Sequence, residues 1–252
     1  MKKKYVIALF SFILLLIITS SVQAEFEIDA GVSYNRVNLE DFNDFLSTRG
    51  SENDARLRDL LPEEETERNS FDEIKSSLGA RISGRYWFND LIAIGGGAEA
   101  FLISTPEYDL DFDGRNVYDE DFQLGLYGAL VEAKAKVLKE DNIIVNLNAG
   151  FGRYYSSLEW NRKYDGDIFG LEEDREENFA YDADSWGAKF GSELSFTVRD
   201  DISLDGTVNY RLLAIDDYTD DEGNKFFDSY NNQVMEFDFS GFELKSSISF
   251  KF

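Results

Sequence analysis

The sequence predicts an all-β protein, an eight-stranded antiparallel transmembrane β-barrel with four long extracellular loops and three short periplasmic turns. Three observations support this prediction. The first 24 residues have the order of a secretory signal peptide. Eight later segments alternate apolar and polar residues with the period of a β-strand. The connections between these segments alternate regularly between short and long.

The amino-terminal segment begins with three lysines, continues with an apolar run at 5–18, and ends in small residues up to Ala24. The apolar run, of about 14 residues, is shorter than the roughly 18 that a membrane-spanning helix needs. We therefore expect 1–24 to be a cleaved signal peptide rather than an uncleaved helical anchor. Residues 25–252 are then expected to form one outer-membrane barrel domain, because no linker to a second domain is evident.

Composition narrows the possible functions. The chain contains no cysteine, which excludes a disulfide framework, a cysteine metal site and a lipid-anchored amino terminus. Without the signal lysines the chain carries 22 basic and 50 acidic residues, a net charge of -28, so nucleic acid is an unsuitable partner. No apolar stretch after residue 24 is long enough for a spanning helix. A chain of this kind crosses a membrane only as a closed barrel.

The first four expected strands lie at 26–35, 75–88, 92–102 and 127–137. In the first, apolar residues from Phe26 to Tyr34 occupy every second position, and the second strand repeats this alternation. Only Asn89 and Asp90 separate the second strand from the third, which indicates a hairpin turn. The fourth strand sets alanines and valines against charged residues.

The last four expected strands lie at 145–155, 186–198, 202–212 and 242–252. The fifth alternates apolar residues with asparagine and glycine, and the remaining three alternate them with charged residues, serine and threonine. The segment 139–142 joins the fourth strand to the fifth, and 199–201 joins the sixth to the seventh. Both segments are rich in charged turn residues.

Short connections therefore follow the second, fourth and sixth strands. The long connections lie at 39–73, 105–121, 161–184 and 216–233. This layout is typical of outer-membrane barrels, with long loops outside the cell and short turns and both termini in the periplasm. A soluble β-sandwich would have no reason to place every short turn on one side. The expected location is the outer membrane of a diderm bacterium, among outer-membrane lipids.

Charge is distributed unevenly between the loops and the strands. The four long connections hold 34 acidic and 9 basic residues, whereas the inward faces of the strands are nearly balanced. An eight-stranded barrel is only wide enough to be filled by side chains, so we expect a plug of paired charges and no wide aqueous pore. The expected lumen ion pairs are formed by Glu27, Asp29, Arg81, Arg85, Glu99, Glu132, Lys134, Lys189, Glu193, Asp205, Arg211, Glu243 and Lys245.

Aromatic residues gather where the strands are expected to leave the membrane, as amphipathic rings do. They are Tyr86, Trp87, Phe88 and Phe252 near the short turns, and Tyr34, Tyr155, Trp160 and Trp186 near the long loops.

Four features of the chain point to a known family: the signal peptide, the eight alternating strands, the segment Arg85-Tyr86-Trp87-Phe88-Asn89-Asp90 before a glycine-rich strand, and the final aromatic residue Phe252. In these features the chain resembles the family of small outer-membrane barrels typified by the OmpA membrane domain, OmpX and OmpW. The resemblance implies the barrel-assembly machinery as a partner, which would read an assembly signal at Leu244, Ile248, Phe250 and Phe252. The chain is expected to lack an appended peptidoglycan-binding domain and to be a monomer.

Catalysis is not expected. Outer-membrane enzymes of similar size resemble one another in using a histidine, and this chain has none. A serine or carboxylate nucleophile would then need a lysine base or a carboxylate pair. Lysines such as Lys134 and Lys189 are better explained as lumen ion pairs.

The second long connection contains a partial calcium-loop motif. Asp109, Asp111, Asp113, Gly114 and Glu120 match positions 1, 3, 5, 6 and 12 of such a loop. Against a calcium site, Arg115 adds a positive charge, strands rather than helices flank the segment, and acidic loops produce such matches by chance. A bound calcium ion and a solvated acidic loop therefore both remain open.

The first long connection carries Leu39, Phe42, Phe45 and Leu46 at helical spacing. A helix there would cap the barrel mouth or lie on the outer leaflet, and the alternative is a mobile surface loop. Three functions remain open from the sequence: a structural or surface-interaction barrel, a narrow channel for small solutes, and a soluble lipocalin-like carrier.

Overall fold

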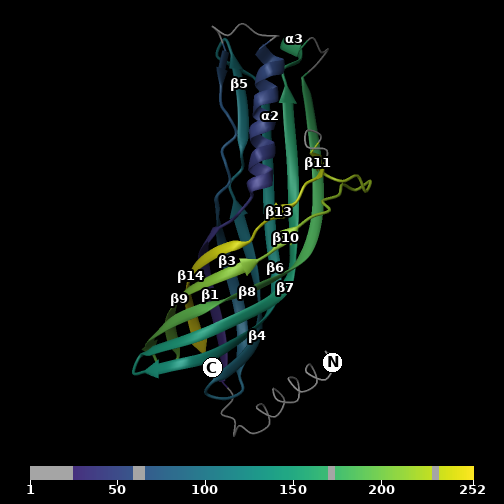
Figure 1. Ribbon diagram of the computed structural model, residues 1–252. Coiled ribbons are helices and arrows are strands. Elements are labelled where there is room, and N and C mark those ends of the chain that lie inside the picture. Colours follow the sequence, from purple (N-terminus) through teal and green to yellow (C-terminus); the bar gives the residue numbers. More distant parts are fainter. Residues whose placement is uncertain (1–24, 59–65, 170–173, 229–232) are drawn as a thin grey trace.

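Eight strands close into a ring in the computed structural model, which describes residues 25–58, 66–169, 174–228 and 233–252. The ring consists of β1 (Glu25–Arg36), β3 (Ser76–Trp87), β4 (Ile92–Ile103), β6 (Arg115–Glu140), β7 (Ile143–Tyr164), β8 (Arg175–Arg199), β9 (Ile202–Leu212) and β14 (Gly241–Lys251). Each pairs antiparallel with its neighbours, and β1 pairs with β14 to close the ring (Figure 1). The predicted eight-stranded barrel is confirmed, whereas the predicted signal peptide, 1–24, lies outside the described residues.

One end of the barrel carries the three short turns. Between β3 and β4 the side-chain oxygen of Asn89 accepts hydrogen bonds from the amides of Leu91 and Ile92, at 2.9 and 2.8 Å. Phe26 and Phe252, at the two ends of the ring, exchange backbone hydrogen bonds of 3.2 and 2.8 Å at this same end. The predicted short turns therefore lie on one side of the barrel with these two strand ends. No helix among the described residues is long and apolar enough to span a membrane.

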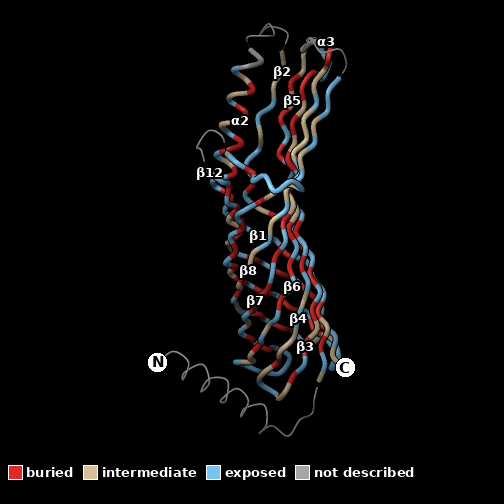
Figure 2. Tube along the Cα trace, turned by 90° about the vertical axis from the view of Figure 1, so that its right-hand side faces the viewer, coloured by how far each residue is buried: buried red, intermediate tan, exposed pale blue. Residues whose placement is uncertain are grey.

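The outer surface of the barrel is an apolar belt. Outward-facing side chains such as Leu102 and Trp186 are 77% and 61% exposed, although a water-soluble protein would normally bury them. Buried and exposed residues alternate along the barrel strands (Figure 2). The belt ends sharply toward the long connections. On the outer face of β8, the apolar residue Trp186 is followed in that direction by the charged residues Asp184 and Asp182. The same alternation that predicted the strands thus separates the lipid-facing side chains from the lumen.

Three strands continue well beyond the belt. The even-numbered face of β6 remains buried past the membrane boundary, at Leu124, Phe122, Glu120 and Tyr118. In this region β6, β7 and β8 stay paired, and β5 (Glu107–Phe112) and β2 (Thr66–Arg68) extend the same sheet. The prediction of loops at 105–121 and 161–184 is therefore largely wrong. Most of these residues form the sheet that we call the extension.

The first long connection forms α2 (Glu40–Arg58), which packs on one face of the extension (Figures 1 and 2). Leu39 immediately precedes α2, and together with Phe42, Phe45 and Leu46 within it is at most 4% exposed, as expected for residues on one helix face. Glu40 and Asp41 lie in its first turn, where their negative charges interact favourably with the positive end of the helix dipole. Of the alternatives for this segment, the structure shows a helix, whose first turns pack at the mouth of the barrel and whose later turns lie along the extension.

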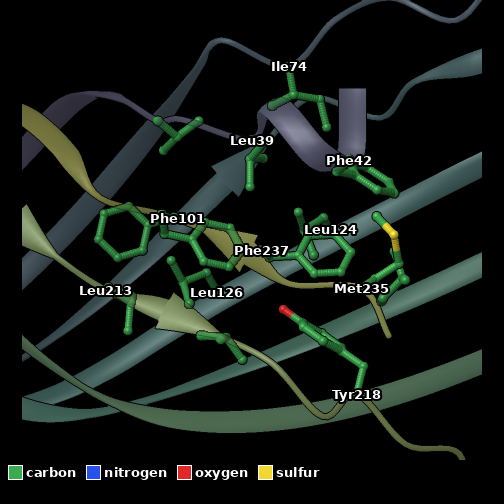
Figure 3. Close-up of a cluster of buried hydrophobic side chains, with 14 of the residues drawn as sticks. Leu39, Phe42, Ile74, Phe101, Leu124, Leu126, Leu213, Tyr218, Met235 and Phe237 are labelled. Carbon is green, nitrogen blue, oxygen red and sulfur yellow. The ribbon is translucent and has the colours of Figure 1, made fainter. Parts of the chain in front are cut away.

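The segment between β9 and β14, which includes the fourth long connection, crosses the top of the barrel in its described parts (Figure 1). It contains β10 (Ala214–Ile215), β11 (Phe227–Asp228), β12 (Gln233–Val234) and β13 (Phe237–Asp238), and α3 (Gly166–Phe169) lies in the third connection. Phe237 of β13 packs against Phe42 of α2, with ring centroids 4.8 Å apart. One buried cluster runs from α2 to lumen-facing residues such as Phe101 and Leu126 (Figure 3). We call α2 and the described residues of this crossing segment, 213–228 and 233–240, the cap.

Candidate functional site: the filled lumen and its cap

The lower part of the lumen, toward the short turns, is filled by one ion network. Arg85 lies 3.4 Å from Glu27, 3.6 Å from Asp29 and 4.0 Å from Glu193. Lys134 donates to Glu193 at 2.5 Å, and Lys245 donates to Asp29 at 2.8 Å. These side chains come from five strands, so the network joins opposite walls of the barrel.

A second network lies above the first. Lys189 donates to Glu99 at 2.6 Å and lies 3.8 Å from Glu132 and 4.0 Å from Glu243. Arg81 pairs with both Glu132 and Glu99, and the Arg211 guanidinium lies 3.9 Å from Glu99. Twelve of the thirteen side chains expected to form lumen ion pairs are therefore within 4.0 Å of an opposite charge.

Asp205 is the exception among the thirteen. It is 4% exposed and accepts a hydrogen bond from Ser249, but no ion pair of Asp205 is found among the described residues. Between the two networks a cavity of ≈ 20 Å³ remains, lined by Arg81, Arg85 and Glu132 among others. A space of this size holds about one water molecule. The lumen is therefore packed rather than open.

Small residues make room for these long side chains. Gly150 faces the lumen beside the upper network, and a Cβ atom there would lie 3.2 Å from Glu132 Oε1 and 3.4 Å from Lys189 Cγ. Gly128 and Gly187 flank the ring of Tyr154, whose hydroxyl donates to Glu99 at 2.7 Å. Tyr154 thus separates the ion networks below from the apolar cluster of the cap above.

We expect Gly128→Ala to lower the free energy of unfolding by about 1–3 kcal/mol, the usual effect of overpacking. The added Cβ would lie 2.6 Å from the Tyr154 ring, which would have to move away from Glu99. Guanidinium unfolding in lipid vesicles, followed by tryptophan fluorescence, measures the change. Gly206→Ala is the matched control, because nothing lies within 4 Å of a Cβ there. Equal stability of the two variants would contradict the packing role of Gly128.

Glu120 holds α2 on the extension. Its carboxylate is fully buried and accepts hydrogen bonds from four side chains: Arg49 Nε at 3.0 Å, Asn53 Nδ2 at 2.5 Å, Tyr118 Oη at 2.9 Å and Trp160 Nε1 at 2.7 Å. The Arg49 guanidinium also lies over the Trp160 ring, 5.3 Å from its centroid.

These partners come from α2, β6 and β7. Burial and the neighbouring Glu120 carboxylate raise the pKa of Tyr118 well above its ordinary value, so this hydroxyl stays a donor. This cluster was not predicted from the sequence. The signal was available, since Glu120 is the single charged residue on the even-numbered face of β6 between Asn116 and Leu130.

This arrangement contradicts the calcium-loop prediction. Asp113 and Gly114, with φ values of 50° and 72°, form the tight turn of a hairpin between β5 and β6. Asp109 pairs with Asp119, whereas Glu120 pairs with Tyr108 and points to the opposite face. Asp109, Asp111, Asp113 and Glu120 therefore do not converge on one ion. Among the described residues, no group of three or more acidic side chains is placed to hold a metal.

The aspartates of this hairpin lie on its outer face and repel one another. Burial, followed by the charges of Asp109 and Asp121, raises the pKa of Asp119. A carboxyl group with a raised pKa favours the folded state in acid, and this contribution is lost as the pH rises through that pKa. The outer face of the hairpin is therefore an acidic surface that is destabilising at neutral pH.

The predicted position at the membrane boundary is wrong for two of the aromatic residues, because their side chains face inward. Trp87 is 5% exposed and donates to Glu27 at 2.9 Å, and Trp160 packs on Phe122 with ring centroids 5.4 Å apart. Tyr155 and Trp186 do lie on the outer surface at the expected boundary. The residues of the expected assembly signal, Leu244, Ile248, Phe250 and Phe252, are all exposed on β14 or directly after it, and their role stays a prediction.

A closed ring of eight strands, an apolar outer belt and short turns confined to one end define a transmembrane β-barrel of the outer-membrane class. The protein lies in an outer membrane, with the cap and the extension on the side of the long connections. No family model and no curated protein matches the sequence.

Several solved structures have a similar fold but low sequence identity to this chain. A major outer membrane protein from Thermus thermophilus is 11% identical, with coverage of 92% of this chain and 100% of that chain and a TM-score of 0.46. Neisserial surface protein A is 13% identical, with coverage of 91% and 97% and a TM-score of 0.44. Ail, the attachment invasion locus protein of Yersinia pestis, solved with the heparin analogue sucrose octasulfate, is 12% identical, with coverage of 92% and 100% and a TM-score of 0.43.

Proposed function

We propose that this protein is a non-conducting, non-catalytic barrel that anchors a folded, acidic interaction domain at the cell surface. The observation that carries the proposal is the double closure of the lumen. Two ion networks fill its lower part, and the apolar cap covers its upper part. Buried charges held this closely to their partners are costly to separate, so they do not move aside for a passing solute.

Neither of the other two functions left open by the sequence suits this interior. A narrow channel needs a continuous aqueous path, whereas the cavity between the two ion networks is only ≈ 20 Å³. A carrier of the lipocalin kind needs a cavity of roughly 300 Å³ or more for its ligand. If the protein were a soluble carrier, its apolar belt would also be exposed to water.

The extension and the cap support an interaction role. Strands that only span a membrane need about 9–11 residues, whereas β6, β7 and β8 have 26, 22 and 25 residues. The additional residues support α2 and the crossing segment on a rigid sheet. The long connections also contain most of the excess acidic residues. A rigid acidic platform of this kind suits the binding of a basic partner outside the cell.

Conductance of the refolded protein in a planar bilayer tests the proposal. We expect no reproducible unitary openings at either polarity. Openings whose size changes in Glu132→Ala would show that ions pass through the lumen, because Glu132 lines its remaining cavity. That result would overturn the proposed function in favour of the narrow channel.

A further inference from the structure

Strand β8 has an unpaired edge outside the membrane. On one side it pairs with β7 without interruption from Arg175 opposite Tyr164 to Phe196 opposite Ile143. On the other side its pairing with β9 ends where Ala188 lies opposite Leu212. The residues of β8 that precede Ala188 therefore lack a continuous neighbour on that side.

The single bridge on this edge shows which backbone groups are unpaired. Asp182 donates its amide to Thr219 at 2.9 Å and accepts from the Thr219 amide at 3.0 Å, so these groups point away from β7. Backbone groups alternate in direction along a strand, and no bulge interrupts the pairing of β8 with β7. The N–H and C=O groups of Glu176, Asn178 and Ala180 consequently point the same way. No described segment pairs with these three residues.

Side chains at this edge indicate the chemistry of a partner. Glu176, Asn178 and Asp182 project from the outer face and are exposed, so they would lie beside every second residue of an added strand. Phe179 and Tyr181 project from the inner face and are half-buried. A second copy of β8 would place like charges opposite each other, which is unfavourable. A strand with alternating basic and apolar residues would match both faces.

We propose that residues 175–181 of β8 bind an extended, basic polypeptide segment as an additional β-strand. Main-chain hydrogen bonds supply affinity in this mode of binding, and alternate side chains supply specificity. The inference rests on the proposed function, because it names the surface and the class of partner for that interaction domain.

The experiment measures binding of an eight-residue peptide of alternating lysine and valine to the refolded full-length protein in detergent, by fluorescence anisotropy. Ala180→Pro removes an N–H that points to the unpaired edge and places a ring where the added strand would lie, without removing a hydrogen bond to β7. We expect this variant to weaken binding by about tenfold or more, since each lost hydrogen bond costs about 1 kcal/mol and steric exclusion adds to it. Ala180→Ser retains the N–H and should bind like the unmodified protein.

A second probe keeps the test independent of the folding of the proline variant. The same peptide with alternate backbone amides methylated should bind the unmodified protein about tenfold more weakly, because one edge of the peptide is blocked. Equal binding of the methylated and unmethylated peptides, or unchanged binding by folded Ala180→Pro, would overturn the inference. If the peptide does not bind and the planar bilayer shows no openings, this inference is refuted and the proposed function is not affected. Lumen openings would refute the proposed function.

Discussion

Replacing Glu120 by glutamine should lower the free energy of unfolding by about 3–5 kcal/mol, as expected when one partner of a buried ion pair is removed. The Glu120 side chain is fully buried, and that of its partner Arg49 is 11% exposed. Each of the four side chains around Glu120 donates to its carboxylate. A glutamine would remove the negative charge that faces Arg49 and would turn an NH₂ group toward other donors.

The effect should be concentrated in the cap. Arg49 and Asn53 are the α2 residues that bond to Glu120, so hydrogen exchange should become faster in α2 and remain slow in the barrel strands. Unfolding in lipid vesicles and exchange by mass spectrometry measure the two quantities. Glu159→Gln is the matched control, because Glu159 is exposed on the outer face of β7 and should change stability by less than about 0.5 kcal/mol. Equal effects of the two substitutions would refute the role of Glu120.

Lys189→Met should cost a similar amount, about 3–5 kcal/mol. The Lys189 side chain is 2% exposed and lies within 4.0 Å of Glu99, Glu132 and Glu243. Methionine fills a similar volume but supplies no charge. The upper network would then hold three carboxylates with only Arg81 and Arg211 as cations.

A double-mutant cycle separates the charge from the packing. Adding Glu99→Gln to Lys189→Met removes one of the uncompensated charges, so the double variant should be more stable than the sum of the single effects predicts. Lys163→Met, on the exposed outer face of β7, should be nearly neutral. Additive effects of Lys189→Met and Glu99→Gln would show that their contact at 2.6 Å contributes no coupling to the folded state.

The barrel was predictable because each of its strands has a different environment on each side. Residues such as Ile82 and Leu204 face lipid, whereas Arg81 and Asp205 face the lumen, so the sequence must alternate. Inward charges could be recognised in the same way, and the small diameter of an eight-stranded barrel implied that they pair. Which carboxylate pairs with which cation depends on register and stagger, so Asp205 could not be identified as the exception.

The extension was missed because its composition is that of a loop. Outer-face residues such as Asp119 and Asp121 make the segment acidic overall, while Phe122 on the other face packs against Phe42 and Phe45 of α2. Those partners are distant in sequence, so local propensity could not reveal that the strands continue. The calcium motif failed for a related reason. Strand geometry places Asp109 and Glu120 on opposite faces of one hairpin.

The sequence by itself determined the barrel, its eight strands, its apolar belt and the excess of acid in the connections, because each follows from alternation along one strand or from local composition. Only the tertiary structure decided that Glu120 is the buried anchor of α2, that the cap closes the mouth, and that β8 leaves an edge unpaired. These features depend on contacts between segments such as α2 and β6, which are far apart in the chain. Packing fixes such contacts, and no local pattern encodes them.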